Sequence, residues 1–314
     1  MASRAGRWLV CGALAAAMVT SCGSPGHRPP SGAQNGTKPP IASTGGVSPP
    51  PSGPPTVAGS SGAASSPASP GAGHSGVPVR PGHRWMPTPG EAWQWQLTTP
   101  VDTSVNVPVY DIDLFENSAA VVSRLHALGR HVICYVSVGS AESFRPDYAS
   151  LPASVLGKSN GWPGERWLDI RELPVLEPIM AARLDQCRAK GFDAVEPDNV
   201  DGYTNATGFP LTAADQLAYN RMIARLAHER GLSVGLKNDV EQVGQLVGDF
   251  DFTVNEECYA FDECAMLRPF IAAGKAVFHV EYNEATSAFC PQSRAYRFSS
   301  MKKNLDLDAA RWPC

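Results

Sequence analysis

Residues 191–201 read GFDAVEPDNVD, an apolar strand pattern that begins after a glycine and breaks into acidic residues. Pro197 has no backbone N–H to donate, so the hydrogen-bonded ladder is expected to stop near it. Glu196, Asp198 and Asp201 then crowd the carboxyl end of this strand, together with Asn199. Burying several carboxylates without partners is costly, so we interpret the cluster as a functional site at the end of the strand. The alternative is an acidic loop that faces solvent.

The sequence around this stretch repeats an alternation of strand and helix patterns. Strands are predicted at 92–98, 107–114, 131–138, 192–198, 233–237, 250–255, 276–282 and 297–301. Helices are predicted at 118–128, 173–190, 211–230, 240–247, 264–273 and 307–312, with a long irregular stretch at 143–171. Eight strands alternating with helices favour a (β/α)8 TIM-type barrel, whose active site lies at the carboxyl ends of the strands. An open doubly wound sheet is the alternative, but no GxGxxG follows the first strand.

The amino terminus has the pattern of an export signal. Arg4 and Arg7 precede an apolar run at 8–19 that is too short to span a bilayer. The run ends in Val-Thr-Ser-Cys22, which resembles a bacterial lipobox. The resemblance implies a lipoprotein signal peptide at 1–21, with a lipid attached to Cys22. The alternative is an ordinary secreted protein with an incidental cysteine.

Residues 22–84 are dominated by Pro, Gly, Ser, Ala and Thr and contain no acidic residue. Such a segment cannot bury enough apolar surface to offset its ordering entropy, so a disordered linker is predicted. Residues 85–314 are then a single domain. We expect an exported protein, anchored to the membrane and facing the extracytoplasmic side.

Charge is divided unevenly along the chain. All 30 Asp and Glu residues lie at or after Glu91, whereas six of the 26 Lys and Arg residues precede it. The predicted domain is therefore strongly acidic, which argues against nucleic acid as a partner. An acidic surface favours a cationic ligand. The alternative is that the charge serves solubility alone.

Six of the eight cysteines fall in the predicted domain, and an even number in an exported domain indicates disulfides. Six cysteines allow fifteen pairings. No CxxC pair or paired-histidine motif accompanies them, so we expect no metal and no cofactor. The pairings we favour are Cys134–Cys187, Cys258–Cys264 and Cys290–Cys314.

Two carboxylates at different strand ends are the minimal equipment for cleaving a glycosidic bond. The candidates are Asp198 as nucleophile and Glu256 as acid and base, since a short Asp suits a fixed nucleophile and a longer Glu can reach the leaving oxygen. A calcium site is an alternative, but no D-x-D-x-D-G loop is present. The seven histidines are scattered, which disfavours a Ser or Cys nucleophile.

Aromatic residues near the predicted strand ends suit sugars, whose apolar faces pack on flat rings. The alternative is that they are ordinary core residues. Glu142, which follows the strand at 131–138, is a further polar candidate. The aromatic candidates are Trp93, Trp95, Tyr135, Trp162, Trp167, Tyr203, Tyr259 and Tyr282.

Six motifs occur in order along the domain and together resemble glycoside hydrolase family 114. They are WQWQL at 93–97, ICYVSVGS at 133–140, GWPGERWLDI at 161–170, EPDNVDGY at 196–203, GLKND at 235–239 and NEEC at 255–258. The resemblance covers 93–314. It implies a (β/α)8 barrel and an endo-α-1,4-polygalactosaminidase that retains configuration. De-acetylated galactosamine polymer is cationic, which fits the acidic domain.

The resemblance also implies roles for individual residues. The acidic pair of the family falls on Asp198 and Glu256, with Glu257 adjacent. Glu196 stands where a smaller polar residue such as Asp is expected. We expect a monomeric polysaccharide hydrolase; the alternatives are a non-catalytic carbohydrate-binding barrel and a glycosidase for another α-linked glycan. The site-lining strand ends implied by the resemblance are Asp113, Asp201, Lys237, Asn238 and Glu281.

Overall fold

The computed structural model describes residues 84–314, so the predicted signal peptide, Cys22 and most of the linker lie outside the described residues. Eight parallel strands form the wall of the molecule, each hydrogen-bonded to the next in chain order. The parallel order confirms the predicted TIM-type fold class. The strands are β1 (Trp93–Gln96), β2 (Val109–Asp113), β3 (His131–Ser137), β7 (Ala194–Asp198), β8 (Ser233–Lys237), β9 (Phe252–Glu256), β10 (Val277–Glu281) and β11 (Ser299–Lys302).

The wall has a seam between β11 and β1, which are not joined by a backbone ladder within residues 84–314. The C-terminal segment fills this seam. Strand β12 (Trp312–Pro313) pairs antiparallel with β11, and Arg311 Nη2 donates to Trp93 O at 2.9 Å. Trp93 Nε1 also donates across the seam to Ser299 O at 2.8 Å. The C-terminal segment and these side-chain hydrogen bonds therefore close the seam between β11 and β1.

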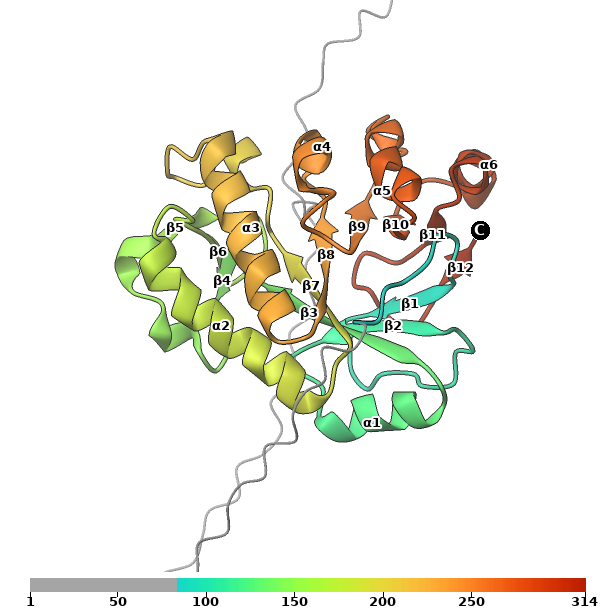
Figure 1. The fold of residues 1–314 in the computed structure, drawn as a ribbon, viewed down its shortest axis with the longest axis horizontal. Helices are drawn as coiled ribbons and strands as arrows, with labels where there is room; N and C mark the ends of the chain where they lie inside the picture. The colour runs from blue at the N-terminus through green and yellow to red at the C-terminus, as the bar shows by residue number, and fades with distance from the viewer. Residues whose placement is uncertain (1–83) are drawn as a thin grey trace, which may run out of the picture.

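Helices cover the outside of the strands (Figure 1). The best defined is α3, which begins with a capping box: the Thr212 hydroxyl accepts from Asp215 N and the Asp215 carboxylate accepts from Thr212 N. None of the helices within 84–314 is long and apolar enough to cross a membrane. The helices are α1 (Ala119–Ala127), α2 (Leu173–Lys190), α3 (Ala213–Glu229), α4 (Val243–Leu246), α5 (Arg268–Ala272) and α6 (Thr286–Tyr296).

Successive side chains along each strand point to opposite faces of the sheet, and this alternation produces two apolar cores. One lies between strands and helices, and the other fills the inside of the barrel with side chains such as Trp93, Ile133, Phe252 and Phe278. Gly235 leaves room for this inner core, because a Cβ there would lie 2.4 Å from Phe252 Cε2. The packed interior leaves the polar strand ends above it as the place for a site.

Two sequence predictions about secondary structure are wrong. Residues 307–312 are not a helix; Leu307 has φ 49°, and the segment ends in β12. The last helix is α6, which precedes β11 and was missed because Pro291 lies inside it.

The predicted irregular stretch contains β5, β6 and short 3-10 turns, and its two strands join β4, which directly precedes the stretch, in an antiparallel sheet of order β4-β6-β5. These strands are too short to give a periodic pattern. They are β4 (Ser140–Glu142), β5 (Leu156–Ser159) and β6 (Glu165–Leu168); the 3-10 turns of the chain are η1 (Tyr148–Ser150), η2 (Ala153–Val155), η3 (Gly202–Thr204), η4 (Val240–Gln242) and η5 (Cys264–Leu267).

The structure contains the three favoured disulfides. Cys134 on β3 bonds to Cys187 on α2, which ties the outer core together. Cys290 on α6 bonds to Cys314 and holds the chain end against the seam. Cys258 and Cys264 close a short loop directly after β9. The last bond therefore restrains the backbone next to Glu256.

Candidate active site

Three neighbouring strands each end on a charged residue that the sequence singled out. Asp198, Lys237 and Glu256 are the last residues of β7, β8 and β9. The residue after each has a left-handed backbone, with φ 63° at Asn199, 50° at Asn238 and 61° at Glu257. The backbone therefore turns at the same point on all three strands. This common turn places the three charged side chains side by side at one rim.

The end of β3 packs tightly against the turn that follows Asp198. Val138 N and Gly139 N both donate to Asp198 O, at 3.0 and 3.1 Å. A Cβ at position 139 would lie 1.6 Å from Asn199 O, so only glycine fits this approach. The left-handed turn at Asn199 is thus fixed by its neighbour strand as well as by its own sequence.

Lys237 is the centre of the site. Its Nζ lies 3.1 Å from Glu196 Oε1, 3.0 Å from Asp198 Oδ1 and 3.2 Å from Glu256 Oε2. Burial acts to lower the pKa of Lys237, but the three carboxylates outweigh it and hold that pKa well above its ordinary value. The ammonium group therefore stays charged and gathers the acids around one point.

The two candidate catalytic carboxylates are close together. Asp198 Oδ1 and Glu256 Oε2 lie 3.0 and 3.2 Å from the same nitrogen, so they are no farther apart than the sum of these distances. Retaining glycosidases hold their carboxyls roughly 5–5.5 Å apart, and inverting ones roughly 6.5–9.5 Å apart. The limit here applies to the two oxygens nearest Lys237 Nζ, and it places both carboxylates at one point of the rim. The side chains of Asp198 and Glu256 remain 15% and 18% exposed, whereas that of Lys237 is 2% exposed, so both acids reach solvent.

Asp198 is held by several donors. Tyr135 Oη donates to Oδ2 at 2.7 Å, and Asn199 N donates to Oδ1 at 2.7 Å. Burial acts to raise the pKa of Asp198, but Lys237 and these hydrogen bonds outweigh it, so that pKa lies below its ordinary value. Asp198 is therefore an ionised carboxylate at neutral pH, as a nucleophile must be.

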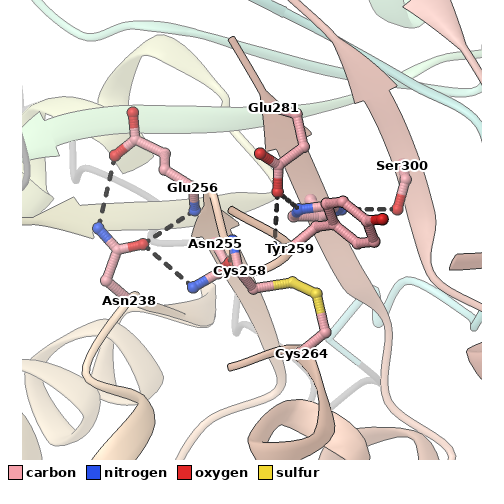
Figure 2. Close-up of a disulfide and its surroundings, with 9 residues drawn as sticks. Asn238, Asn255, Glu256, Cys258, Tyr259, Cys264, Glu281 and Ser300 are labelled. Atoms are coloured by element: carbon pink, nitrogen blue, oxygen red, sulfur yellow. Dashed lines mark hydrogen bonds and ion pairs between the residues drawn. A yellow bond between two sulfur atoms is a disulfide. The ribbon is translucent and has the colours of Figure 1, made fainter. Parts of the chain in front are cut away.

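Glu256 is held from the neighbouring strands on either side. Tyr282 Oη donates to Glu256 Oε1, and Asn238 Nδ2 donates to Oε2 at 3.4 Å, as Figure 2 shows for Asn238. Asn238 Oδ1 also accepts from Glu256 N at 3.0 Å. Burial, followed by the charge of Glu256, raises the pKa of Tyr282 well above its ordinary value, so this phenol remains a donor. Glu256 is thus oriented by neutral groups as well as by Lys237.

A buried layer lies beneath these acids. Glu196 and Asp111 are both fully buried, and no oxygen of either carboxyl forms a hydrogen bond with another described residue. The ring of Trp95, also buried, lies 4.8 Å from Lys237 Nζ. Glu196 and Trp95, which the sequence suggested as substrate contacts, therefore form the floor under Lys237.

A second acidic group flanks the site. Arg145 bridges Asp113 and Glu142, donating to Asp113 Oδ2 at 2.5 Å with its Nη2 lying 2.8 Å from Glu142 Oε1. Glu165 faces Glu142 across the small sheet. Burial, then the charges of Glu142 and Asp198, raise the pKa of Glu165 to about 7. Glu165 therefore changes charge near neutral pH beside the candidate nucleophile.

Several predicted site residues lie elsewhere. Glu281 points to the outer face of β10, where its Oε1 lies 2.8 Å from His279 Nε2 and accepts from Tyr259 N at 2.8 Å (Figure 2). Tyr259 packs against Phe289 on that same outer side. Trp93 is buried in the inner core.

The remaining predicted residues follow the strand ends without contacting the central lysine directly. Tyr203 donates its hydroxyl to Glu241 at 3.0 Å. Asp201 lies buried in the turn after β7, where its backbone oxygen accepts from Thr204. Glu257 continues from Glu256, and its backbone N donates to Val280 O at 2.8 Å.

Two residues of the site escaped the sequence predictions. Asp111 lies two positions before Asp113 on β2, so strand alternation places both on the inner face. Glu165 lies inside the motif GWPGERWLDI, but the small sheet that carries it was not predicted. The alternation of side chains along β2 could have indicated that Asp111 shares the face of Asp113, whereas the position of Glu165 depends on tertiary packing.

Solved structures resemble this fold over most of its length. The crystal structure of Aspergillus fumigatus Ega3 in complex with galactosamine is similar, with a TM-score of 0.71 and 39% identity over 74% of this chain and 98% of that chain. The glycoside hydrolase domain of PelA from Pseudomonas aeruginosa has a TM-score of 0.54 and 14% identity, covering 70% of this chain and 96% of that domain. The second likeness concerns the fold alone.

Sequence comparison agrees with the structural likeness. An uncharacterized protein of Deinococcus radiodurans is 30% identical over 224 residues, which is 60% of this chain and 71% of that protein. The model of glycoside-hydrolase family GH114 matches residues 75–314. Since this match spans the whole barrel, the chain belongs to glycoside-hydrolase family GH114 and is a glycoside hydrolase.

Proposed function

We propose that this hydrolase is a retaining, endo-acting enzyme that cleaves α-1,4-linked galactosamine polymer with Asp198 and Glu256. The observation that carries the proposal is that Asp198 Oδ1 and Glu256 Oε2 both lie within 3.2 Å of one buried ammonium nitrogen, which pairs two carboxylates as glycosidic cleavage requires. The ionised state of Asp198, held by Lys237 and Tyr135, suits a nucleophile. The partial exposure of both acids gives a substrate access to them.

The mechanism follows from these positions in two steps. Asp198 attacks the anomeric carbon while Glu256 gives a proton to the leaving oxygen, so a covalent glycosyl-enzyme forms and the first product departs. Glu256 then removes a proton from water, which attacks the same carbon and releases Asp198. Tyr135 and Lys237 donate to Asp198, which keeps the displaced carboxylate stable when the second step frees it.

Charge supports a cationic amino sugar as the substrate. Asp198, Glu256, Glu142 and Glu165 lie at or beside the rim, and their nearest cations already pair with several acids each. An ammonium group on the sugar adds positive charge where the protein has an excess of negative charge. The similar Aspergillus protein was solved in complex with galactosamine, which is such a sugar.

The test is hydrolysis of de-acetylated and acetylated galactosamine polymers, with products analysed by mass spectrometry and their anomeric configuration by NMR. We expect oligomers from the de-acetylated polymer, with the α-anomer formed first. Monomers alone would indicate an exo enzyme. Initial β-anomer would overturn the retaining mechanism, and cleavage of only the acetylated polymer would overturn the cationic substrate.

Variants separate catalysis from binding. Asp198→Asn should abolish cleavage, and Glu256→Gln should lower kcat by about 10²–10⁴-fold on a substrate with a poor leaving group. Glu257→Gln, one residue along, should lose far less. Full turnover in Asp198→Asn would remove Asp198 from the mechanism. Binding of the polymer without any turnover by the unmodified protein would favour a carbohydrate-binding barrel instead.

We also propose that the enzyme acts as a monomer on the outer face of a membrane, held by a lipid on Cys22. The support is the lipobox-like sequence that ends at Cys22 and the Pro-, Gly- and Ser-rich segment that follows it. Replacing Cys22 by Ser should move the protein from the membrane fraction to the medium. An unchanged distribution would exclude the lipid anchor, and light scattering of the Cys22→Ser protein would report its oligomeric state.

A further inference from the structure

Two fully buried carboxyl groups, Asp111 on β2 and Glu196 on β7, lie beneath the acids of the rim. Both strands pair with β3, and their partners there are Ile133 and Tyr135, two residues apart on one face. The charges of Asp111 and Glu196 act on each other, and no oxygen of either carboxyl forms a hydrogen bond with another described residue. Neither side chain is exposed to solvent that could stabilise two negative charges.

The described residues supply no hydrogen-bond donor to either oxygen of Asp111. Glu196 differs, because its Oε1 lies 3.1 Å from Lys237 Nζ. A buried carboxylate with neither donor nor counterion is strongly disfavoured, and two adjacent carboxylates repel each other. A carboxylic acid that donates its own proton to its neighbour removes both problems at once.

We propose that Asp111 and Glu196 hold a single shared proton, carried by Asp111 and donated to Glu196, and that this pair positions Lys237 beneath Asp198 and Glu256. The catalytic consequence rests on the proposed two-carboxylate mechanism, whereas the shared proton does not. With one proton, Asp111, Glu196 and Lys237 together carry no net charge. Without it, the floor of the site carries a buried negative charge.

The groups that face this pair all favour the same arrangement. Lys237 from β8 and Asp198 from β7 are the charged neighbours of both carboxyls, with Glu256 from β9 on the far side of Lys237. Burial, then the charge of Glu196, raise the pKa of Asp111 well above its ordinary value. The remaining titratable neighbours are Tyr135 from β3 and Tyr282 from β10, and both are neutral phenols that donate to Asp198 and Glu256. Trp95 from β1 covers Lys237 with its ring.

A positioning role predicts that a conservative replacement restores function. Asp111→Asn keeps a donor that reaches Glu196, so we expect kcat within about threefold of the unmodified enzyme. Asp111→Leu keeps the branched shape of the side chain without the donor, and the loss of a hydrogen bond to a charged group should lower kcat by about tenfold or more, with little change in KM. Equal losses in both variants would contradict a role for the proton.

The proton itself is observed without substrate, by infrared spectroscopy at neutral pH in a Glu165→Gln background, which removes the other carboxyl whose pKa is raised to about 7. We expect a carbonyl band of a protonated carboxylic acid that persists in Glu256→Gln and disappears in Asp111→Asn. In Glu196→Gln the band should shift, because the acceptor of its hydrogen bond changes. A spectrum of the Glu165→Gln protein that lacks this band, or that loses it only when Glu256→Gln is added, would overturn the proposal.

The pH dependence of unfolding gives a second measurement. An acid whose pKa is raised by folding contributes stability that is present below its unfolded value of 3.8 and is lost as pH rises toward the folded value. Asp111→Asn removes this loss, so its stability relative to the unmodified protein should increase steadily from pH 5 to pH 8. The matched control is Asp262→Asn, an exposed aspartate with φ 57°, which asparagine also adopts.

These outcomes separate the two proposals. A protonated carboxyl together with a pH-dependent gain in Asp111→Asn supports the shared proton even if no galactosamine polymer is cleaved. A pH-independent stability difference in Asp111→Asn contradicts it even if the enzyme is active. Should Asp111→Asn fail to fold, Glu196→Gln provides the same infrared test.

Discussion

A single buried ammonium group determines which states the acids of the site can adopt. Lys237 lies within 3.2 Å of one oxygen on each of Glu196, Asp198 and Glu256. A buried carboxylate without a counterion would take up a proton instead of staying charged. Lys237 therefore keeps Asp198 ionised, the form that the proposed nucleophile requires. Its role is electrostatic, although it also fixes the distance between the two candidate catalytic acids.

Replacement of Lys237 by Met should abolish activity and lower the free energy of unfolding by about 3–5 kcal/mol at neutral pH, because it strands several buried carboxylates. The depressed pKa of Asp198 contributes stability above its unfolded value of 3.8, and this contribution disappears at lower pH. The difference in unfolding free energy between variant and unmodified protein should therefore narrow as pH falls below 3.8.

Denaturant unfolding from about pH 2 to pH 8 measures this difference. Lys158→Met changes an exposed lysine on β5 and should stay within about 0.5 kcal/mol of the unmodified protein. A Lys237→Met protein that is as stable at pH 7 as the unmodified one would show that the acids do not depend on this cation.

Glu165 is expected to tune affinity for cationic ligands near neutral pH. With its pKa raised to about 7 by burial and by Glu142 and Asp198, it gains negative charge as pH rises from 6 to 8. In calorimetric titrations with galactosamine oligomers, the affinity ratio between unmodified protein and Glu165→Gln should grow by about twofold to fivefold over this range.

The ligand's own titration cancels in that ratio, because both proteins are compared at each pH. Glu229→Gln, at an exposed position on α3, serves as the control for a general charge effect. A constant ratio for Glu165→Gln from pH 6 to 8 would mean that Glu165 does not act on bound ligand.

At the level of elements, the site depends on how strands end. β7, β8 and β9 each place a charged residue last and a left-handed residue next. Neighbouring elements fix these turns: β3 donates to Asp198 O, and the Cys258–Cys264 disulfide closes the loop after β9. The turns are therefore restrained before any ligand binds, which is the preorganisation that catalysis requires.

The tight contact at Gly139 gives a direct test of this restraint. Gly139→Ala should displace the Asn199 turn, lower stability by about 1–3 kcal/mol and lower activity far more than stability alone explains. Gly244→Ala is the matched control, because nothing lies within 4 Å of a Cβ there and the residue is in α4, where alanine is favourable. Melting curves and kcat of both variants decide the point. Full activity in Gly139→Ala would show that the turn tolerates displacement.

At the scale of the whole molecule, net charge is the property that bears on binding of a cationic polymer. Acidic residues are confined to the part of the chain from Glu91 onward, which carries an excess of negative charge. Complementary charge raises the rate of encounter with a cationic polymer and is screened by salt. The acidic rim and the acidic surface therefore act in the same direction on such a substrate.

Hydrolysis of de-acetylated galactosamine polymer should weaken as salt rises from about 0.05 to 0.5 M, mainly through a higher KM, since the Debye length shortens over this range. Acetylated polymer lacks the ammonium groups and should bind with an affinity that depends little on salt. Initial rates at several ionic strengths test both statements. A KM for the cationic polymer that is independent of salt would remove charge complementarity from recognition.

The sequence determined the parts of this protein that depend on local pattern. Alternation and apolar runs predicted the eight strands to within about two residues, and the helix predicted at 211–230 is α3, Ala213–Glu229. Where a local signal misled, prediction failed: Pro291 hid α6, and an acidic-apolar run at 307–312 was taken for a helix. Glu281 was placed on the rim because it ends a strand, but alternation turns it outward to His279.

Only tertiary structure decided how the acids interact. The sequence brought Asp198, Lys237 and Glu256 to the ends of three strands, because parallel strands joined by helices put those ends at one rim. It did not contain the ion pairs of Lys237, the buried pair of Asp111 and Glu196, or the approach of Glu165. These arise when segments distant in the chain are excluded together from water, where charge and proton occupancy depend on neighbours and not on residue type.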